Sequence, residues 1–392
     1  MASAFLFTYG FVALLLTVNA LRRLRSPRAP LPPLWLPAMI TTSLAPFWAI
    51  SRIVIGAGFV GIGGTRLAMG RLGLWMLGGS LIGLGLLMVR NTRSVRLLRS
   101  GIATPVFAES LPTLLTGRPV PTPPDVEQVD GLPYGAAGTF DLIRPRRAVR
   151  RAPLFVYVHG GGWTGGGPQK QARRMYHSLA REGWTVAALR YPLAPGATIC
   201  DQVRSINQAI HHFRTEADRY DIDPGRIVLS GSSAGGHLAS LAALGTSPEF
   251  RDGFGPADVS VAACIPMYGI YDMVNRFKTR PNWPYVDRDV MRGSYDEKPD
   301  EFHAVSPIDH LRADAPPFLV VHGTHDSLVP IAEAEVFVEA ARAAGADVEF
   351  VRVLGAQHGF DAVSSGVSRH AAALVTTWAG RRVGAIPDRS ER

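Results

Sequence analysis

A serine flanked by glycines is the clearest sign of chemistry in the sequence. Ser233 is the centre of Gly231-x-Ser233-x-Gly235, which directly follows the apolar run 226–230 and directly precedes a helix-like stretch. Glycines two positions to either side permit the tight strand-to-helix turn that holds a serine hydroxyl clear of a sheet. The N-terminus of the following helix then lies under the developing negative charge. Because this pattern is common by chance, Ser233 needs suitable partners to be assigned as a nucleophile.

A glycine-rich segment precedes this serine and indicates the same chemistry. His159-Gly-Gly-Gly-Trp163 ends a β-rich run and begins 74 residues before Ser233. Acyl transfer passes through a tetrahedral oxyanion that needs preorganised N–H donors, and glycines let backbone amides approach it closely. We expect Gly161 and Gly162 to donate, with Ala234 as the third donor of the oxyanion hole. A turn that only packs is the alternative.

The acid and the base are predicted at the ends of two later runs. Asp326 lies in a polar turn after the apolar run 317–322, and His358 lies in a loop after the run 347–353. The chain order serine, acid, histidine is the order that α/β-hydrolases use. In this reading His358 takes the proton of Ser233 and returns it to the leaving group, while Asp326 holds the imidazole tautomer.

Other polar residues compete for these roles. His325 is adjacent to the predicted acid and is the rival base, and Asp272 follows an apolar run and is the rival acid. The sequence contains no His-Glu-x-x-His motif and no cluster of Cys and His, so neither a metal nor another cofactor is expected. Cys200 and Cys264 are too few for a disulfide framework, and both are expected to be buried thiols.

The alternation of β-rich and helix-like segments from residue 136 onward predicts the fold that positions these residues. Short β-rich runs alternate with helix-like stretches, which favours an α/β fold with a mostly parallel sheet covered on both faces. The β-rich runs are 139–144, 153–158, 185–190, 226–230, 259–268, 317–322 and 347–353, and the helix-like stretches include 167–182, 201–219, 234–245, 331–344 and 366–379.

The net charge is unevenly distributed along the chain. The whole chain has a formal net charge of +9. Its first 108 residues contain eleven arginines, no lysine and no acidic residue, and so carry a formal charge of +11. The remainder carries about −2, so the basic character does not belong to the region with the chemistry. Nucleic acid is therefore not expected as a partner.

Apolar segments in the same region predict membrane helices. Residues 1–21 carry no charge and are long enough to cross a bilayer, and 72–89 is a second uncharged candidate. A cleaved secretory signal is the alternative for the first segment, although its positive charge follows the apolar run instead of preceding it. Residues 34–64 are apolar but interrupted by Pro37, Pro46 and Arg52, which fits one span, a kinked span or a re-entrant segment.

One motif in this region suggests a different function. The segment 52–61 contains Gly56-x-Gly58-x-x-Gly61, the pattern of a dinucleotide-binding turn. That fold requires an acidic residue about 20 positions later to hold the ribose, and the first acidic residue here is Glu109. We therefore expect no dinucleotide cofactor and interpret the glycines as points of close helix packing in lipid.

Three motifs together resemble a known family. His159-Gly-Gly-Gly-Trp163, Gly231-Ser-Ser-Ala-Gly-Gly236 and Asp326-Ser-Leu-Val-Pro330 resemble the hormone-sensitive-lipase-like branch of the α/β-hydrolases over roughly residues 135–382. The membrane segments look like an actinobacterial lipase and esterase subgroup and, more distantly, like isoprenylcysteine methylesterases. The resemblance implies an α/β-hydrolase fold, an oxyanion hole in the glycine motif, and hydrolysis of carboxylic esters with short to medium acyl chains.

The expected domain organisation follows from these segments. We expect a transmembrane region of two to three helices at 1–99, a Pro-rich linker or partial cap at 100–135, a catalytic domain at 136–383 and a disordered tail at 384–392. In the resembled family a cap usually precedes the glycine motif. The insertion 275–301 is a second possible wall above the site, or else a solvated loop.

Several functions share these residues. A serine carboxylesterase or lipase acting on a small-molecule or lipid ester is the first. An amidase or arylformamidase, a membrane-bound acyltransferase and a catalytically inactive binding protein are the alternatives. With three spans, four arginines in 22–33 and four in 90–99 outnumber three in 51–71. The positive-inside rule then predicts a multi-pass protein with its catalytic domain on the cytoplasmic face.

Overall fold

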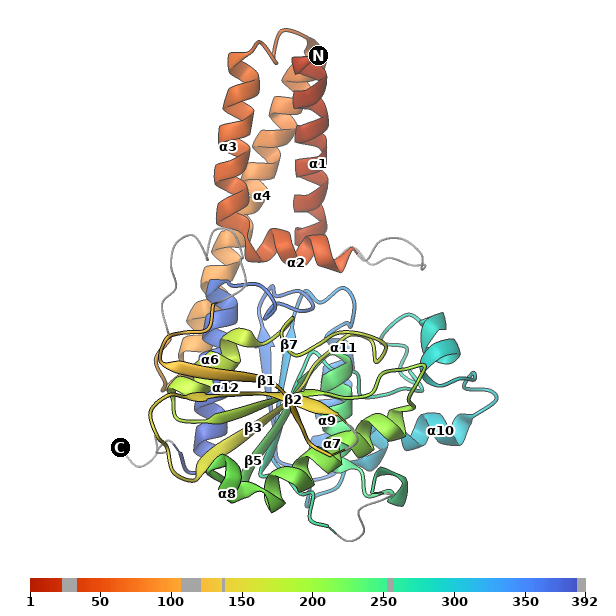
Figure 1. Ribbon diagram of the computed structural model, residues 1–392. Helices are drawn as coiled ribbons and strands as arrows, with labels where there is room; N and C mark the ends of the chain where they lie inside the picture. The colour runs from red at the N-terminus through yellow and green to blue at the C-terminus, as the bar shows by residue number, and fades with distance from the viewer. Residues whose placement is uncertain (23–33, 107–120, 136–137, 252–256, 386–392) are drawn as a thin grey trace.

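The computed structural model describes residues 1–22, 34–106, 121–135, 138–251 and 257–385. Three arginines of the predicted 22–33 cluster, residues 107–120 of the predicted Pro-rich linker and most of the predicted tail lie outside these ranges. The described chain forms a bundle of long helices at one end and a layered domain of helices and strands at the other (Figure 1).

The layered domain is built on one sheet. Within the described ranges it has eight strands in the order β1-β2-β4-β3-β5-β6-β7-β8. β2 pairs antiparallel with both β1 and β4, and all later pairings are parallel. The strands are β1 (Val126–Pro133), β2 (Thr139–Pro145), β3 (Ala152–Val158), β4 (Thr185–Arg190), β5 (Ile222–Ser232), β6 (Ala263–Met267), β7 (Phe318–Gly323) and β8 (Val348–Val353).

Helices cover both faces of this sheet. Residues of α7, α9 and α11 share one apolar core with one sheet face, and residues of α6 and α12 share a second core with the other. The helices are α6 (Arg173–Arg181), α7 (Ile199–Thr215), α8 (Ala217–Tyr220), α9 (Ala234–Leu244), α10 (Pro299–Ala304), α11 (Ala332–Ala343) and α12 (Gly366–Arg382), with short turns at Pro248–Phe250, Val286–Val290 and Pro307–His310. The predicted α/β class is confirmed.

One strand was not expected. β1 lies at the edge of the sheet, inside the segment 100–135 for which a linker or partial cap was predicted. Its backbone pairs with β2 from Val126 opposite Pro145 to Pro133 opposite Thr139. Because most of its side chains are partly or fully exposed, β1 lacks the continuous apolar run that marked the central strands. The hydrolase sheet therefore begins before residue 136.

The described part of residues 1–99 forms a bundle of four helices. They are α1 (Ala2–Arg22), α2 (Trp35–Ser43), α3 (Ala45–Gly61) and α4 (Ala68–Arg99). Within the described residues, α1 and α4 are each long and apolar enough to cross a membrane, and α2 with α3 forms a pair bent by 85° that also passes this test. Of the three interpretations of 34–64, this bend contradicts a straight single span, and it fits both a kinked span and a re-entrant segment.

Close packing of α1 on α4 depends on small residues. A Cβ atom built on Gly73 would lie 2.5 Å from the Leu6 carbonyl oxygen, so only glycine allows this approach. Among the glycines of the dinucleotide-like motif, Gly56 packs against Leu77 of α4, whereas a Cβ atom built on Gly58 or on Gly61 would meet nothing within 4 Å. The packing interpretation therefore holds for Gly56, and the tightest contacts are made by other glycines.

The helix α4 joins the bundle to the layered domain. Its 32 residues span about 48 Å at 1.5 Å per residue, which exceeds the hydrocarbon core of about 30 Å. Leu98, near its C-terminal end, is buried in the same core as Val375 of α12. Just beyond α4, the backbone N–H of Thr104 donates to Thr377 Oγ1 at 3.1 Å. The two parts of the molecule are thus connected by a packed helix.

Candidate active site

The predicted nucleophile lies at the single residue between a strand and a helix. β5 ends at Ser232 and α9 begins at Ala234, so Ser233 alone makes the turn. Its φ of 56° and ψ of −123° are strained for a residue with a side chain. The strained conformation is held by the backbone, since the Ser233 N–H donates to the Met267 carbonyl at 2.9 Å. This geometry is that of a nucleophile elbow.

The flanking glycines are required by close backbone contacts. A Cβ atom on Gly231 would clash with the carbonyl oxygen of Gly235. A Cβ atom on Gly235 would clash with the carbonyl oxygen of Val158 and would lie 2.5 Å from that of His159. The elbow is therefore wedged against the end of β3, where the glycine-rich turn begins.

The structure brings the predicted base and acid to this serine. His358 Nε2 lies 2.9 Å from Ser233 Oγ, and His358 Nδ1 lies 2.7 Å from Asp326 Oδ2. Asp326 is in the turn after β7 and His358 in the loop after β8, so both reach Ser233 from the carboxyl end of the sheet. All three side chains are buried. This arrangement can move a proton from the serine hydroxyl to the imidazole.

The environment of Asp326 keeps the carboxylate ionised. Its Oδ1 accepts hydrogen bonds from the N–H groups of Leu328 at 3.0 Å and Val329 at 2.8 Å. Burial alone raises the pKa of Asp326, but the charge of His358 and hydrogen bonds from His322 and His358 outweigh it and lower the pKa to about 2. An ionised Asp326 can orient His358 and stabilise its imidazolium form.

Two side chains near this group were missed by the sequence reasoning. His322, fully buried on β7, has Nε2 2.9 Å from the Val329 carbonyl oxygen and 3.3 Å from Asp326 Oδ2. The ring of Tyr268 stands edge-on to His358 with centroids 4.7 Å apart, and its hydroxyl donates to Asp361. His322 shares the His322-Gly-Thr-His-Asp326 segment with the acid, which was a usable signal. Tyr268 directly follows β6 and gave no such signal.

The glycine-rich turn lies directly beside the elbow. A Cβ atom on Gly160 would be 3.1 Å from Ser233 Cβ. The next two residues adopt positive φ values, 136° at Gly161 and 61° at Gly162, which favour glycine. Within the described residues, no backbone carbonyl accepts the N–H of Gly161, Gly162 or Ala234. The position and free amides of this turn suit an oxyanion hole.

The rival acid and base have other contacts. Asp272 accepts from the Arg276 guanidinium at 3.1 Å and from the Arg276 N–H at 2.8 Å. His325 Nδ1 lies 3.2 Å from Thr324 Oγ1. Within the described residues, the side chain that is hydrogen-bonded to Ser233 Oγ is His358. The structure therefore favours Asp326 and His358 over both rivals.

The two thiols differ from each other. Cys264 is buried in β6, as expected, but Cys200 at the start of α7 is only half-buried, so that part of the expectation was wrong. Burial and the Glu249 carboxylate raise the pKa of Cys200 to about 11. Such a thiol stays protonated near neutral pH and is a poor nucleophile.

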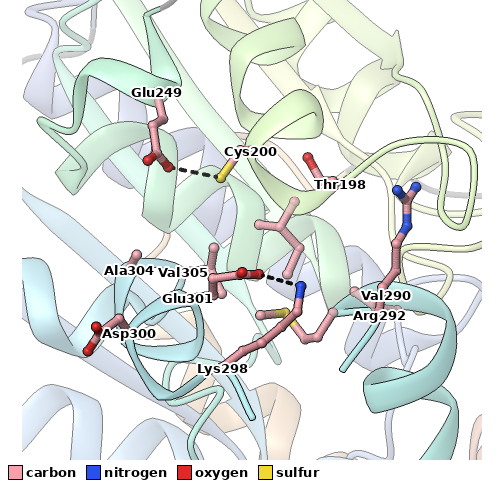
Figure 2. Close-up of a pocket in the computed structure, with 12 residues that line it drawn as sticks. Thr198, Cys200, Glu249, Val290, Arg292, Lys298, Asp300, Glu301, Ala304 and Val305 are labelled. Atoms are coloured by element: carbon pink, nitrogen blue, oxygen red, sulfur yellow. Dashed lines mark hydrogen bonds and ion pairs between the residues drawn. The ribbon is translucent and has the colours of Figure 1, made fainter. Parts of the chain in front are cut away.

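A pocket of about 450 Å³ lies beside Cys200 and is lined by no member of the predicted triad. Figure 2 shows the Cys200 thiol pointing at Glu249 and the Lys298 ammonium paired with Glu301. Its lining also contains none of the three expected oxyanion-hole residues, so the pocket adds no group to the site around Ser233.

The fold and this geometry define the class of the protein. A mostly parallel sheet with its serine at a strand-to-helix elbow, followed by an acid and a histidine after later strands, is an α/β-hydrolase. The chain belongs to the BD-FAE family, which it matches over residues 140–340, about half of its length.

Two relatives of this chain are ester hydrolases by name. Esterase LipQ of Mycobacterium tuberculosis is 37% identical over 270 residues, which are 66% of this chain and 64% of LipQ. Probable carboxylic ester hydrolase LipM of the same organism is 35% identical over 248 residues, 62% of this chain and 58% of LipM. The chain thus spans about 60% of the length of these curated relatives.

A solved structure similar to this chain is also that of an esterase. Butyrate-bound Est2, an esterase of Thermogutta terrifontis, superposes with a TM-score of 0.57 at 26% identity, covering 68% of this chain and 97% of Est2. The match covers nearly all of the solved enzyme, so the layered domain contains a complete esterase-like fold.

Proposed function

We propose that the protein is a serine carboxylic ester hydrolase that acts through an acyl-enzyme on Ser233. The observation that carries this proposal is the continuous hydrogen-bonded chain from Ser233 Oγ through His358 to Asp326, at 2.9 and 2.7 Å. The names of the relatives LipQ and LipM support the same reaction.

The reaction follows from the geometry. His358 Nε2 accepts the proton of Ser233 as Oγ attacks the ester carbonyl, and the carbonyl π electrons move to the oxygen. The N–H groups of Gly161, Gly162 and Ala234 donate to this oxyanion. When it collapses, the ester C–O bond breaks and His358 gives its proton to the leaving alcohol. Water, deprotonated by His358, then releases the acid and restores Ser233.

The acyl specificity belongs to the same proposal. We expect carboxylic esters of short to medium acyl chain, because the solved relative Est2 binds butyrate. Tyr285 supports a bounded acyl site: its hydroxyl would lie 3.1 Å from a Cβ built on Gly162. The insertion 275–301 thus reaches the glycine turn, as expected for a second wall. Amidase, arylformamidase and acyltransferase activities would use the same triad, and no observation favours them.

Substrate profiling tests the reaction type. Full-length protein is assayed on nitrophenyl esters from acetate to decanoate and on matched nitroanilides, with Ser233→Ala as the control variant. We expect hydrolysis of the esters, little hydrolysis of the anilides, and a loss of at least about 10³-fold in Ser233→Ala. Faster turnover of the anilides, or retention of a tenth of the activity by the variant, contradicts the proposal.

The domain organisation is also proposed on the basis of the fold. The helices α1, α3 and α4 run side by side and would form a multi-pass membrane region within residues 1–99 (Figure 1). The short α2 lies across the end of this bundle that faces the layered domain (Figure 1). The layered domain would then lie at one membrane surface and carry the reaction.

We propose that this surface is the cytoplasmic one. Arg22 is the last residue of α1, whose C-terminal end faces the layered domain (Figure 1), and Arg90 of α4 contacts Gly355 of that domain. The turn between α3 and α4, at the other end of the bundle, carries Arg66. Arg52, counted earlier for that turn, is instead buried in the bundle and donates to Thr17 Oγ1 at 2.7 Å. Of the three arginines counted for the α3–α4 end, Arg66 and Arg71 therefore remain there, which supports the same orientation.

Reporter fusions test this orientation. Alkaline phosphatase and a fluorescent protein are fused separately at residue 105 and after residue 392. A bright fluorophore with inactive phosphatase at both points is expected. Active phosphatase with a dark fluorophore at both points would place the domain outside.

A further inference from the structure

A helix of the membrane region contacts the predicted active site. The indole of Trp35, the first residue of α2, stands edge-on to the imidazole of His358, with ring centroids 5.4 Å apart and planes at 78°. A Cβ atom on Gly359 would be 3.5 Å from the same indole. Residues separated by more than three hundred positions in the sequence therefore meet at the proposed base.

The helix α2 is held to the bundle at both of its ends and in its middle. At its start, Asn19 Nδ2 of α1 donates to the Leu34 carbonyl at 2.8 Å. At its end, Asn91 Nδ2 of α4 donates to the Thr42 carbonyl at 2.9 Å. Ala38, in the middle of α2, is fully buried in an apolar cluster with Leu84 of α4. Trp35 is thus presented to His358 by a structure anchored in the membrane helices.

The level of this contact along α4 places it at the membrane boundary. The uncharged stretch 72–89 of α4 is about 27 Å long, close to the hydrocarbon thickness of about 30 Å. Arg90 ends this stretch and its side chain packs on Gly355, where a Cβ atom would clash with it. Gly355 is three residues before His358 in the same loop. The histidine loop therefore lies at the level where the apolar part of α4 ends.

The chemistry of α2 fits the same location. Tryptophan is enriched where hydrocarbon meets headgroups, because its ring is apolar and its N–H is polar. Leu36, next to Trp35, is 40% exposed at the end of the bundle that faces the layered domain. An amphiphilic ester in a bilayer keeps its chain in the hydrocarbon and its ester group near the headgroups, which is the level of Trp35 and His358.

We propose that the substrate is an amphiphilic ester taken directly from the bilayer, and that Trp35 determines specificity by forming the membrane-side wall of the acyl site. The proposal rests on ester hydrolysis by Ser233. It adds that the chain leaves the hydrocarbon past α2 and reaches Ser233 along the indole of Trp35. Tyr285, against the glycine turn, would bound the site from the insertion 275–301.

The test compares two esters with the same leaving group. Full-length protein in phosphatidylcholine vesicles is given methylumbelliferyl acetate, which stays in water, or methylumbelliferyl decanoate, which partitions into the bilayer. The quantity measured is the ratio of kcat/KM for the decanoate to that for the acetate. For the unmodified protein this ratio is expected to be well above one in vesicles.

Substitutions at Trp35 connect this ratio to the contact. Trp35→Ala should lower the ratio at least about 10-fold, mainly through KM for the decanoate, and Trp35→Phe should restore most of it. The matched control is Trp75→Ala, the same truncation at a tryptophan of α4 that is 80% exposed. The control should leave the ratio unchanged.

The outcomes separate this proposal from the proposed function. If Trp35→Ala lowers kcat for both esters by the same factor, Trp35 only supports His358 and the specificity role is wrong. If the unmodified protein hydrolyses acetate but prefers it to the vesicle-borne decanoate, the membrane substrate is wrong while ester hydrolysis stands. This second comparison needs no variant to fold. Hydrolysis of neither ester would instead overturn the proposed function.

Discussion

The contact between the elbow and β3 gives a prediction of defined size for Gly235→Ala. The added Cβ would lie 2.5 Å from the His159 carbonyl oxygen and 2.7 Å from its carbon, and closer still to the Val158 oxygen. An ordinary carbon to oxygen contact is about 3.3 Å or longer, so α9 must shift by roughly 1 Å. A shift of about 1 Å in a reacting group can lower the rate about 10²-fold.

The assay separates this effect from unfolding. We expect kcat/KM for a nitrophenyl ester to fall about 10²-fold, with a loss of about 1–3 kcal/mol in stability from overpacking. Gly225→Ala is the matched control, because it lies in the same strand and its added Cβ meets only Asp223 Oδ1, at 3.4 Å. Gly235→Ala with more than half of the wild-type kcat/KM and an unchanged melting temperature would refute the wedged elbow.

Two further predictions concern Asp326. Asp326→Asn presents an amide to His358 Nδ1 and favours the wrong imidazole tautomer. We therefore expect kcat to fall by at least about 10³-fold with little change in KM, and a loss below about 10-fold would contradict the orienting role of Asp326. The pKa of Asp326 is lowered to about 2 from an ordinary 3.8. The ionised carboxylate therefore contributes about 2 kcal/mol of stability above about pH 4, and this contribution is lost as the pH falls through 2. The stability of the wild type should therefore fall relative to that of Asp326→Asn between pH 4 and 2 in acid denaturation, and parallel curves would exclude this contribution.

The central part of the site could be predicted because each element carried a local signal. Ser233 and its glycines occupy one strand-to-helix turn, and Asp326 and His358 each follow an apolar strand. Parallel strands place their carboxyl ends at one edge of the sheet, so residues after β5, β7 and β8 meet without any further information. For that reason the chain order of serine, acid and histidine was enough to predict that these three side chains lie close together.

The parts that were missed depend on contacts between distant segments. Trp35 reaches His358 only because α2 turns by 85° from α3 across the end of the bundle, and no periodicity in the sequence encodes that angle. The edge strand β1 mixes polar and apolar residues, and most of its side chains are partly or fully exposed, because it pairs with only one neighbouring strand. The inward direction of Arg52 likewise depends on Thr17 and Ser80 of neighbouring helices.

Identification of the residue that carries the acyl group is the most direct test of the account. Full-length protein is treated with a fluorophosphonate, digested and examined by mass spectrometry, alongside His358→Ala under the same conditions. The account predicts a single phosphonyl adduct on Ser233, with the loss of ester hydrolysis in proportion to labelling, and little adduct in His358→Ala. An adduct on another residue, equal labelling of both proteins, or full hydrolysis by the labelled protein would contradict it.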